Sequence, residues 1–197
     1  MASRDFELLK DNYIYIFYDS PEDGEYVLIP SWPDQIQDVI QSTFASTNAL
    51  SRSAPVYSYS NSGPRTVDVS VELRRDMFDQ INFVGSNITP NLGEDYVDTV
   101  IRKLQSIAVP KYNASAKAVQ PPMVAVRFGN EVFIKGIVNG PIRVSYEKPI
   151  TNNGKYFTVN IGFTVYETDP YDADTIAAQG SFRGITRTWM KGIFSKS

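Results

Sequence analysis

The sequence predicts a mainly β protein, an antiparallel β-barrel or sandwich with one main α-helix against it. Two observations lead to this fold class. Several runs carry apolar residues at every second position and end in Gly, Pro, Asn or Asp, which is typical of half-buried strands joined by turns. Only residues 94–110 show a clear helical period in their apolar residues. The elements follow in chain order.

The N-terminal part predicts a β-hairpin followed by loops. Residues 13–18 and 25–29 are rich in Tyr, Ile and Val, and the turn-forming segment 19–24 separates them. Residues 31–44 fit either a short helix capped by Ser31 or a docking loop around Trp32. Residues 46–54 have no apolar period, so we expect a surface connection there.

A second hairpin is expected from residues 55–60 and 63–73, with a turn or bulge at Gly63-Pro64. The second strand alternates strictly, so one face should be buried and the other wet. Its inward row would be Val67, Val69, Val71 and Leu73.

The predicted helix covers residues 94–110. Glu94 and Asp95 lie in its first turn, where the helix dipole favours negative charge, and Pro110 ends it. Its apolar stripe would be Val97, Val100, Ile101, Leu104 and Ala108.

The second half predicts an antiparallel meander with strands in residues 121–128, 131–138, 142–150 and 156–167. The last strand is the longest, and its polar or small outer row carries Tyr156 and Tyr166 at its ends. The inward row would be Phe157, Val159, Ile161, Phe163 and Val165.

The composition removes several kinds of function. The 197 residues include no Cys and no His, which excludes thiolate nucleophiles, imidazole bases and His-ligated or Cys-ligated metals. The net charge of −3 argues against general nucleic-acid binding. The N-terminal apolar run is too short and too close to acids for a signal peptide or a spanning helix, so we expect no membrane. We also expect no cofactor.

Three small groups of residues invite a chemical interpretation. Glu147 and Glu167 end two strands and suggest a carboxylate-dependent hydrolase. The acids Asp169, Asp172 and Asp174 alternate like calcium ligands, but the run lacks the mid-loop Gly and the closing Glu of a calcium loop. Solvated acids are the simpler interpretation of both groups. Four exposed tyrosines suggest a sugar-binding surface: Tyr57, Tyr59, Tyr156 and Tyr166.

The last residues mix aromatic and basic side chains, which is typical of interface cores, so residues 169–197 are predicted to be a partner-docking tail. Trp32 is a further interface candidate. The tail candidates are Phe182, Arg183, Arg187, Trp189, Met190 and Phe194.

The order of the motifs resembles one family. The strand with Arg65-Thr66 precedes the helix, Pro121-Pro122 leads into a strand that ends at Phe128-Gly129, and a strand over residues 133–138 precedes the long strand that closes on Glu167. This order resembles the tail-tube-like domain of contractile phage baseplates and contractile injection systems, over about residues 55 to 168.

The resemblance implies a tail-tube-like β-barrel or sandwich whose copies form a hexameric ring around a channel, with the wet sheet face toward the channel or the next subunit. The implied domains are an N-terminal hairpin and docking segment (1–54), the tube-like domain (55–168) and the tail (169–197).

The implied function is that of a structural virion protein without enzymatic activity. It would be made in the host cytoplasm and built into the baseplate hub or tail-tube initiation ring, where tube, hub and wedge proteins are its partners. Many such baseplate members continue into a LysM module, which this sequence lacks, so we do not expect wall binding by that route.

Three alternatives remain open at this point: a peptidoglycan- or carbohydrate-binding module of a tail, a carboxylate-dependent hydrolase, and an assembly chaperone.

Overall fold

A computed structural model describes residues 12–18, 24–48, 50, 53–78, 88, 90–113, 118–129, 131–169 and 173–174. The strands, in chain order, are β1 (Asn12–Phe17), β2 (Glu25–Leu28), β3 (Ile36–Val39), β4 (Ser42–Thr47), β5 (Val56–Ser62), β6 (Thr66–Arg74), β7 (Lys111–Asn113), β8 (Ala118–Gln120), β9 (Met123–Phe128), β10 (Val132–Val138), β11 (Arg143–Ile150) and β12 (Tyr156–Glu167). The helices are α2 (Arg75–Phe78) and α3 (Tyr96–Ser106). The predicted fold class, mainly β with one main helix, is confirmed.

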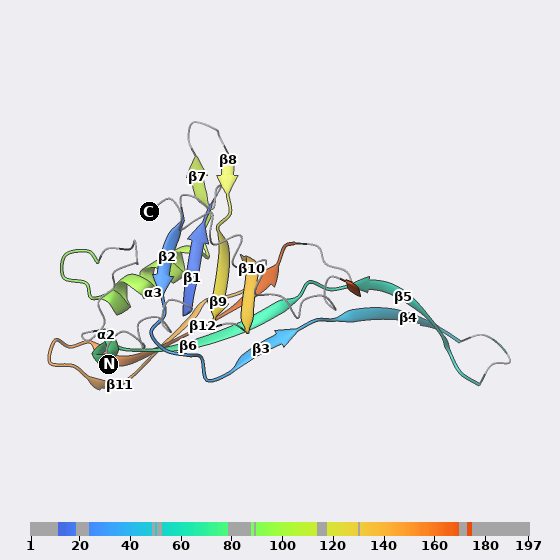
Figure 1. Cartoon of the computed structure of the whole chain (residues 1–197), viewed down its shortest axis with the longest axis horizontal. Coiled ribbons are helices and arrows are strands. Elements are labelled where there is room, and N and C mark those ends of the chain that lie inside the picture. Colours follow the sequence, from blue (N-terminus) through green and yellow to red (C-terminus); the bar gives the residue numbers. More distant parts are fainter. Residues whose placement is uncertain are drawn as a thin grey trace.

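One eight-stranded antiparallel sheet forms the body of the molecule (Figure 1). Its strand order is β2-β1-β9-β10-β12-β6-β3, and β11 also pairs with β12. The strands β10 and β11 lie on one edge of β12, with β11 beside its first half and β10 beside its end. Since both run antiparallel to β12, they act as one long strand with a bend at Gly140, whose φ of 100° suits a residue without a side chain.

The inward rows of the sheet meet in one core. The predicted burial of residues 67, 69, 71 and 73 is confirmed, with exposed fractions of 0 to 2%. In β12 the buried row begins at Val159, because Phe157 is only partly covered. Strands β1, β2, β9 and β10 contribute side chains to the same cluster, together with α3.

Helix α3 packs on the main core and contacts β2 at one end of the sheet. Asp95 is its N-cap and accepts a hydrogen bond from the Asp98 amide at 2.9 Å. The Tyr96 hydroxyl contacts both the amide and the carbonyl group of Leu28 on β2. The helix ends at Ser106, so Ala108 is exposed and not part of the predicted stripe; Ile107 is buried instead.

The N-terminal hairpin is built into the main sheet. The strands β1 and β2 pair as predicted, and β1 also pairs with β9 along its length. Its two faces are both covered, since one set of side chains enters the main core and the other, including Tyr13 and Tyr15, forms a second buried cluster with β2 and β9. This hairpin lies in the expected N-terminal segment 1–54, and its strand β1 pairs with β9 of the expected domain 55–168 in the same sheet.

Two predictions for residues 31–73 are wrong. Residues 36–39 and 42–47 are strands, so the helix alternative for 31–44 does not form. The strand β5 pairs with β4, not with β6, while β6 lies between β12 and β3. The physical reason is that β5 and β6 are one side of a long hairpin, and β3 and β4 are the other side; Gly63 donates a hydrogen bond to the carbonyl oxygen of Gln41 between the two halves.

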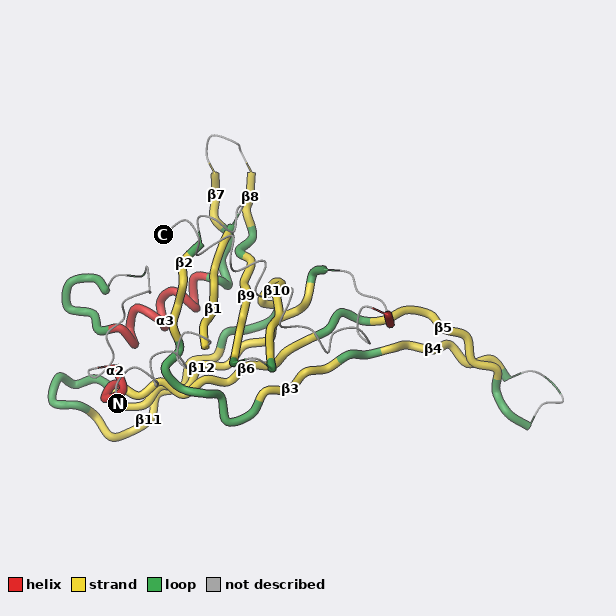
Figure 2. Tube along the Cα trace, viewed as in Figure 1, coloured by secondary structure: helices red, strands yellow, loops and turns green. Residues whose placement is uncertain are grey.

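The outer half of this hairpin, β4 and β5 with residues 42–62, is called the arm below. It extends far beyond the body as a twisted two-stranded ribbon (Figure 2). The short hairpin of β7 and β8 projects from another side of the body and was not predicted. Among the helices that the structure describes, neither is long and apolar enough to span a membrane.

Candidate functional site

The arm carries an aromatic face. Phe44 lies directly across from Tyr59, and Ser46 lies across from Tyr57, so the three aromatic side chains share one side of the ribbon. Their exposed fractions are 55, 59 and 66% for Phe44, Tyr59 and Tyr57. The rings of Phe44 and Tyr59 meet edge to face at 5.7 Å. The opposite side holds only small or β-branched residues, such as Ala45 and Val56.

The arm has few of the charged residues that usually prevent an exposed strand from pairing with another chain. All of its strand residues are exposed, and Arg52 is the only charged residue between positions 40 and 63 of the sequence. Soluble proteins usually protect exposed strand edges with charges or Pro, since unpaired backbone groups invite another strand. A ribbon with one charged residue and an aromatic face therefore has the properties of a contact surface.

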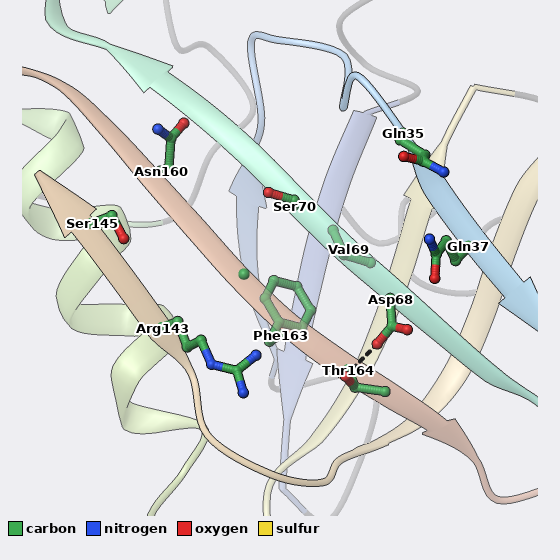
Figure 3. Close-up of a pocket in the computed structure, with 11 residues that line it drawn as sticks. Gln35, Gln37, Asp68, Val69, Ser70, Arg143, Ser145, Asn160, Phe163 and Thr164 are labelled. Atoms are coloured by element: carbon green, nitrogen blue, oxygen red, sulfur yellow. Dashed lines mark hydrogen bonds between the residues drawn. The ribbon is translucent and has the colours of Figure 1, made fainter. Parts of the chain in front are cut away.

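A polar trough of about 500 Å³ lies on the outer face of the sheet half formed by β3, β6, β12 and β11 (Figure 3). Gly162 lies in its floor, between Arg143 on β11 and Ser70 on β6. Because Gly162 has no side chain, the surface is hollow there. The other polar residues that line the trough are Gln35, Gln37, Asp68, Ser145, Asn160 and Thr164.

One of the two charged residues that line the trough, Asp68, already has a partner. The Thr164 hydroxyl donates to Asp68, and the Asn160 amide donates to Glu147 at 2.7 Å. Arg143 makes no ion pair with the residues that the structure describes. The trough is therefore lined mainly by amides and hydroxyls, with Asp68 and Arg143 as its charged residues.

A network of charges fixes the start of α3. Arg75 of α2 contacts Asp95 and Asp98, with 2.9 Å to the latter, and its Nε donates to the Tyr156 carbonyl at 2.7 Å. Lys155 also pairs with Asp98. Burial alone would raise the pKa of Asp98, but hydrogen bonds from Lys155 and Arg75 outweigh it and hold this pKa below 3.8. The network holds α2, α3 and β12 together.

A second charged cluster lies where the arm joins the body. Arg65 is buried and pairs with Asp38, while Glu167 lies 3.8 Å from its Nη1. Burial raises the pKa of Glu167 above 4.5; the Arg65 charge opposes this shift, and Asp169 and Asp38 add to it. Since the partners come from separate strands, the cluster connects the arm's root to the body.

The interface candidates from the sequence are only partly described. Trp32 is 52% exposed, and its ring lies over Gly129, where a Cβ atom would overlap it. This packing, with the Gly129 φ of 60°, fixes the turn between β9 and β10 and leaves half of the indole free for contact. The six tail candidates, Phe182 to Phe194, lie outside the described residues.

The predicted carboxylate pair does not form. Glu147 lies across from Thr158, whereas Glu167 ends the same strand β12, so the two lie about 30 Å apart at ~3.3 Å per residue. A hydrolase needs its two carboxylates within one substrate's reach, so this pair is unsuited to that role.

The other sequence-based groups are dispersed as well. Tyr57 and Tyr59 share the aromatic face of the arm, whereas Tyr156 and Tyr166 lie at the two ends of β12. Asp169 pairs with Lys135 at 3.4 Å, and Asp172 lies outside the described residues. Within the described ranges, no cluster of acidic residues is arranged to hold a metal ion.

Sequence reasoning missed Phe44 and the trough around Gly162. The sequence signal for Phe44 is weak, because residues 42–47 contain a single large apolar residue and directly follow a helix-like spacing. Comparison of the sequence with protein-family models and with curated proteins gives no match. The geometry and the ordered motifs therefore carry the functional argument.

Proposed function

We propose that this chain is a structural subunit of a contractile phage tail, forming a ring at the baseplate hub on which the tail tube begins. The observation that carries the proposal is the arm, a ribbon with a single charged residue in its sequence, an aromatic face and no packing partner among the described residues. A two-stranded ribbon is marginally stable by itself in water. Its extent and composition are explained if a neighbouring subunit covers it.

The sheet offers a way for copies to join into a ring. Strand β3 pairs only with β6 and strand β11 only with β12 among the described strands, so each leaves one edge open. Through β6 and β12, β3 runs antiparallel to β11. When β3 of one copy pairs with β11 of the next, the sheet continues, and such head-to-tail contacts close into a ring if the rotation closes.

In this ring the polar trough faces the channel. Its amides, hydroxyls and Arg143 would keep water at the wall, while the buried rows of β6 and β12 point away from it into each subunit. The arm then reaches out from the ring to a neighbouring copy or to the next layer of tube, hub or wedge proteins. No bond is made or broken, and the work is done by interfaces.

Cross-linking mass spectrometry and electron microscopy of intact particles test this proposal. We expect ring-shaped density at the baseplate and cross-links from β3 of one copy to β11 of the next. A particle that lacks the protein, or cross-links confined to one copy, would contradict it.

A variant sharpens the test. Val39 is 45% exposed on β3, so Val39→Lys should disfavour edge pairing and leave the body folded. Gln105→Lys on the exposed side of α3 is the matched control and should assemble normally. Equal assembly of both variants would exclude β3 as the ring contact.

The aromatic face also supports a second candidate, carbohydrate binding, because sugar rings stack on exposed aromatic side chains. This alternative predicts that the protein sediments with purified peptidoglycan and that Tyr57→Ser with Tyr59→Ser removes the effect. Ring assembly by the wild-type protein without peptidoglycan binding would favour the structural proposal.

A further inference from the structure

The junction between arm and body is a weak point of the backbone pairing. The last residue pair of the body is Val39 with Thr66, and the first residue pair of the arm is Ser42 with Ser62. The residues between these two pairs form no ladder pair. The register also changes within the arm between Thr43 and Phe44. Within this gap the Gly63 amide still donates to the Gln41 carbonyl oxygen at 2.8 Å. Because the ladder is interrupted on both sides of this bond, the backbone fixes the direction of the arm only in part.

Arg65 lies in this interruption and is buried, with an exposed fraction of 6%. Its Nε lies 2.9 and 3.1 Å from the two carboxylate oxygens of Asp38, and its Nη2 donates to Asp38 at 2.6 Å. This fork holds the strand that leads out to the arm against the strand that returns from it.

The other side of the guanidinium faces the body. Nη1 donates to the carbonyl oxygen of Phe133 on β10 at 3.3 Å and lies 3.8 Å from the Glu167 carboxylate at the end of β12. The backbone of Arg65 is held too, because its carbonyl oxygen accepts a hydrogen bond from the Glu167 amide at 2.9 Å. One side chain thus connects both sides of the hairpin to two body strands.

The fit between β10 and β12 is tight at this place. A Cβ atom at Gly136 would overlap the carbonyl oxygen of Tyr166, so only a residue without a side chain allows this approach. Lys135 pairs with Asp169 nearby at 3.4 Å. The ends of β10 and β12 therefore form a fixed base on which Arg65 acts.

We propose that Arg65 is the positioning residue of the arm: its buried guanidinium fixes the direction in which the arm leaves the body. A planar fork with five donors reaches Asp38, Phe133 and Glu167 at once, whereas a lysine offers a single point charge. The apolar core of the body is formed by other residues, so we expect the body to stay folded when this contact is changed. The biological use of the direction rests on the proposed ring, in which a neighbour must receive the arm.

Distance measurements by electron spin resonance on the isolated chain test this proposal. The sequence has no cysteine, so pairs of introduced cysteines give unique spin-label sites. Ser58→Cys with Gln105→Cys reports the arm relative to α3, and Asn153→Cys with Gln105→Cys reports the body alone; all three positions are exposed.

In the Arg65→Lys and Asp38→Asn backgrounds we expect the arm-to-body distance distribution to shift and broaden, while the body distribution stays unchanged. Arg74→Lys, at an ion pair whose two side chains are each 43% exposed, is the matched control and should change neither. An unchanged arm distance in both Arg65→Lys and Asp38→Asn would overturn the proposal. So would a broadened body distance, because Arg65 would then hold the body together rather than direct the arm.

A ring-formation assay on the same variants distinguishes failure of this proposal from failure of the proposed ring. If the arm distance shifts and ring formation is lost, both stand. If the arm distance shifts and rings form as in the wild type, Arg65 still positions the arm, but the direction of the arm is not what the ring requires.

Discussion

The strands β5 and β6 follow one another along one side of the same hairpin, yet they differ in the burial of their side chains. In β6 buried and exposed residues alternate, and its valines and leucine have exposed fractions of 0 to 2%. In β5 all seven residues are exposed. The chain therefore changes from a strand held by a core to a strand held by one partner strand within a few residues.

This difference assigns stability to the body and, in the proposed function, contact with a neighbour to the arm. A large apolar side chain contributes about 1.5–3 kcal/mol when it is fully buried, so the rows of β6 and β12 account for much of the body's stability. The arm has no such row. Its order in solution depends on pairing alone, and its aromatic face gains buried area only when another molecule covers it.

The largest effect is expected from a charge in the body's core. Val159→Asp or Ile161→Asp should prevent folding, since both residues have exposed fractions of 0% and an unpaired buried charge costs several kcal/mol against a total of about 5–15 kcal/mol. Circular dichroism and thermal melting measure this. Ser58→Asp places the same charge on the arm and should melt like the wild type; equal damage from both changes would remove the distinction between the regions.

The charge network at α3 gives the next effect. Arg75→Ala should lower the free energy of unfolding by about 2–3 kcal/mol, because it removes the more buried of the two cations, Arg75 and Lys155, that pair with Asp95 and Asp98. Urea titration measures the change. Arg74→Ala removes a more exposed pair and should cost at most about 1 kcal/mol. A larger effect of Arg74 than of Arg75 would contradict this interpretation of the network.

Much of the body could be predicted from the sequence. The rows of β6 and β12 repeat every second residue, and the stripe of α3 repeats with the helical period, because in each of them one face meets a single core. The turn at Asn152 to Gly154 was also predictable, and Gly154 adopts a φ of 74° there. Local pattern and tertiary packing agree in these segments.

The arm and the site could not be predicted in the same way. Ile36, Val39 and Ile40 have a helix-like spacing, but pairing with the edge of β6 overrides it, and Val39 and Ile40 remain exposed. The contacts of Arg65 join residues distant in sequence, from Asp38 to Glu167, and nothing local in the chain indicates them. The trough likewise arises from the spatial order of β3, β6, β12 and β11, which local sequence patterns do not predict.

A change of pH should affect the stability contributions of the two charged clusters in opposite directions. The pKa of Asp98 lies below its ordinary 3.8 in the folded chain, so its contribution to stability is complete above that value and is lost as the pH falls through the lower, folded-state pKa. The pKa of Glu167 is raised above 4.5, so its contribution is present below 4.5 and is lost as the pH rises through the folded-state pKa.

Stability curves against pH for two variants separate these contributions. Asp98→Asn should remove part of the loss below pH 3.8, and Glu167→Gln should remove part of the loss above pH 4.5. If neither variant changes the shape of the curve, the network at α3 and the arm's root do not contribute to stability as described.

The smallest effect on stability is expected on the arm. Tyr57→Ser combined with Tyr59→Ser should change the free energy of unfolding by less than about 0.5 kcal/mol, because both side chains are already more than half exposed. The same double variant should abolish ring assembly. Val56→Ser on the opposite side of the ribbon is the control. A double variant that assembles normally would show that the aromatic face is not a contact.

Amide hydrogen exchange tests the division between body and arm most directly, since it reports both regions in one sample. In the isolated chain we expect the amides of β6 and β12 to exchange only through global unfolding and those of β4 and β5 to exchange much faster through local opening. On assembly, the amides of β4 and β5 should become protected. Equal protection of β5 and β6 in the isolated chain, or an arm that stays unprotected in the assembled ring, would contradict the account.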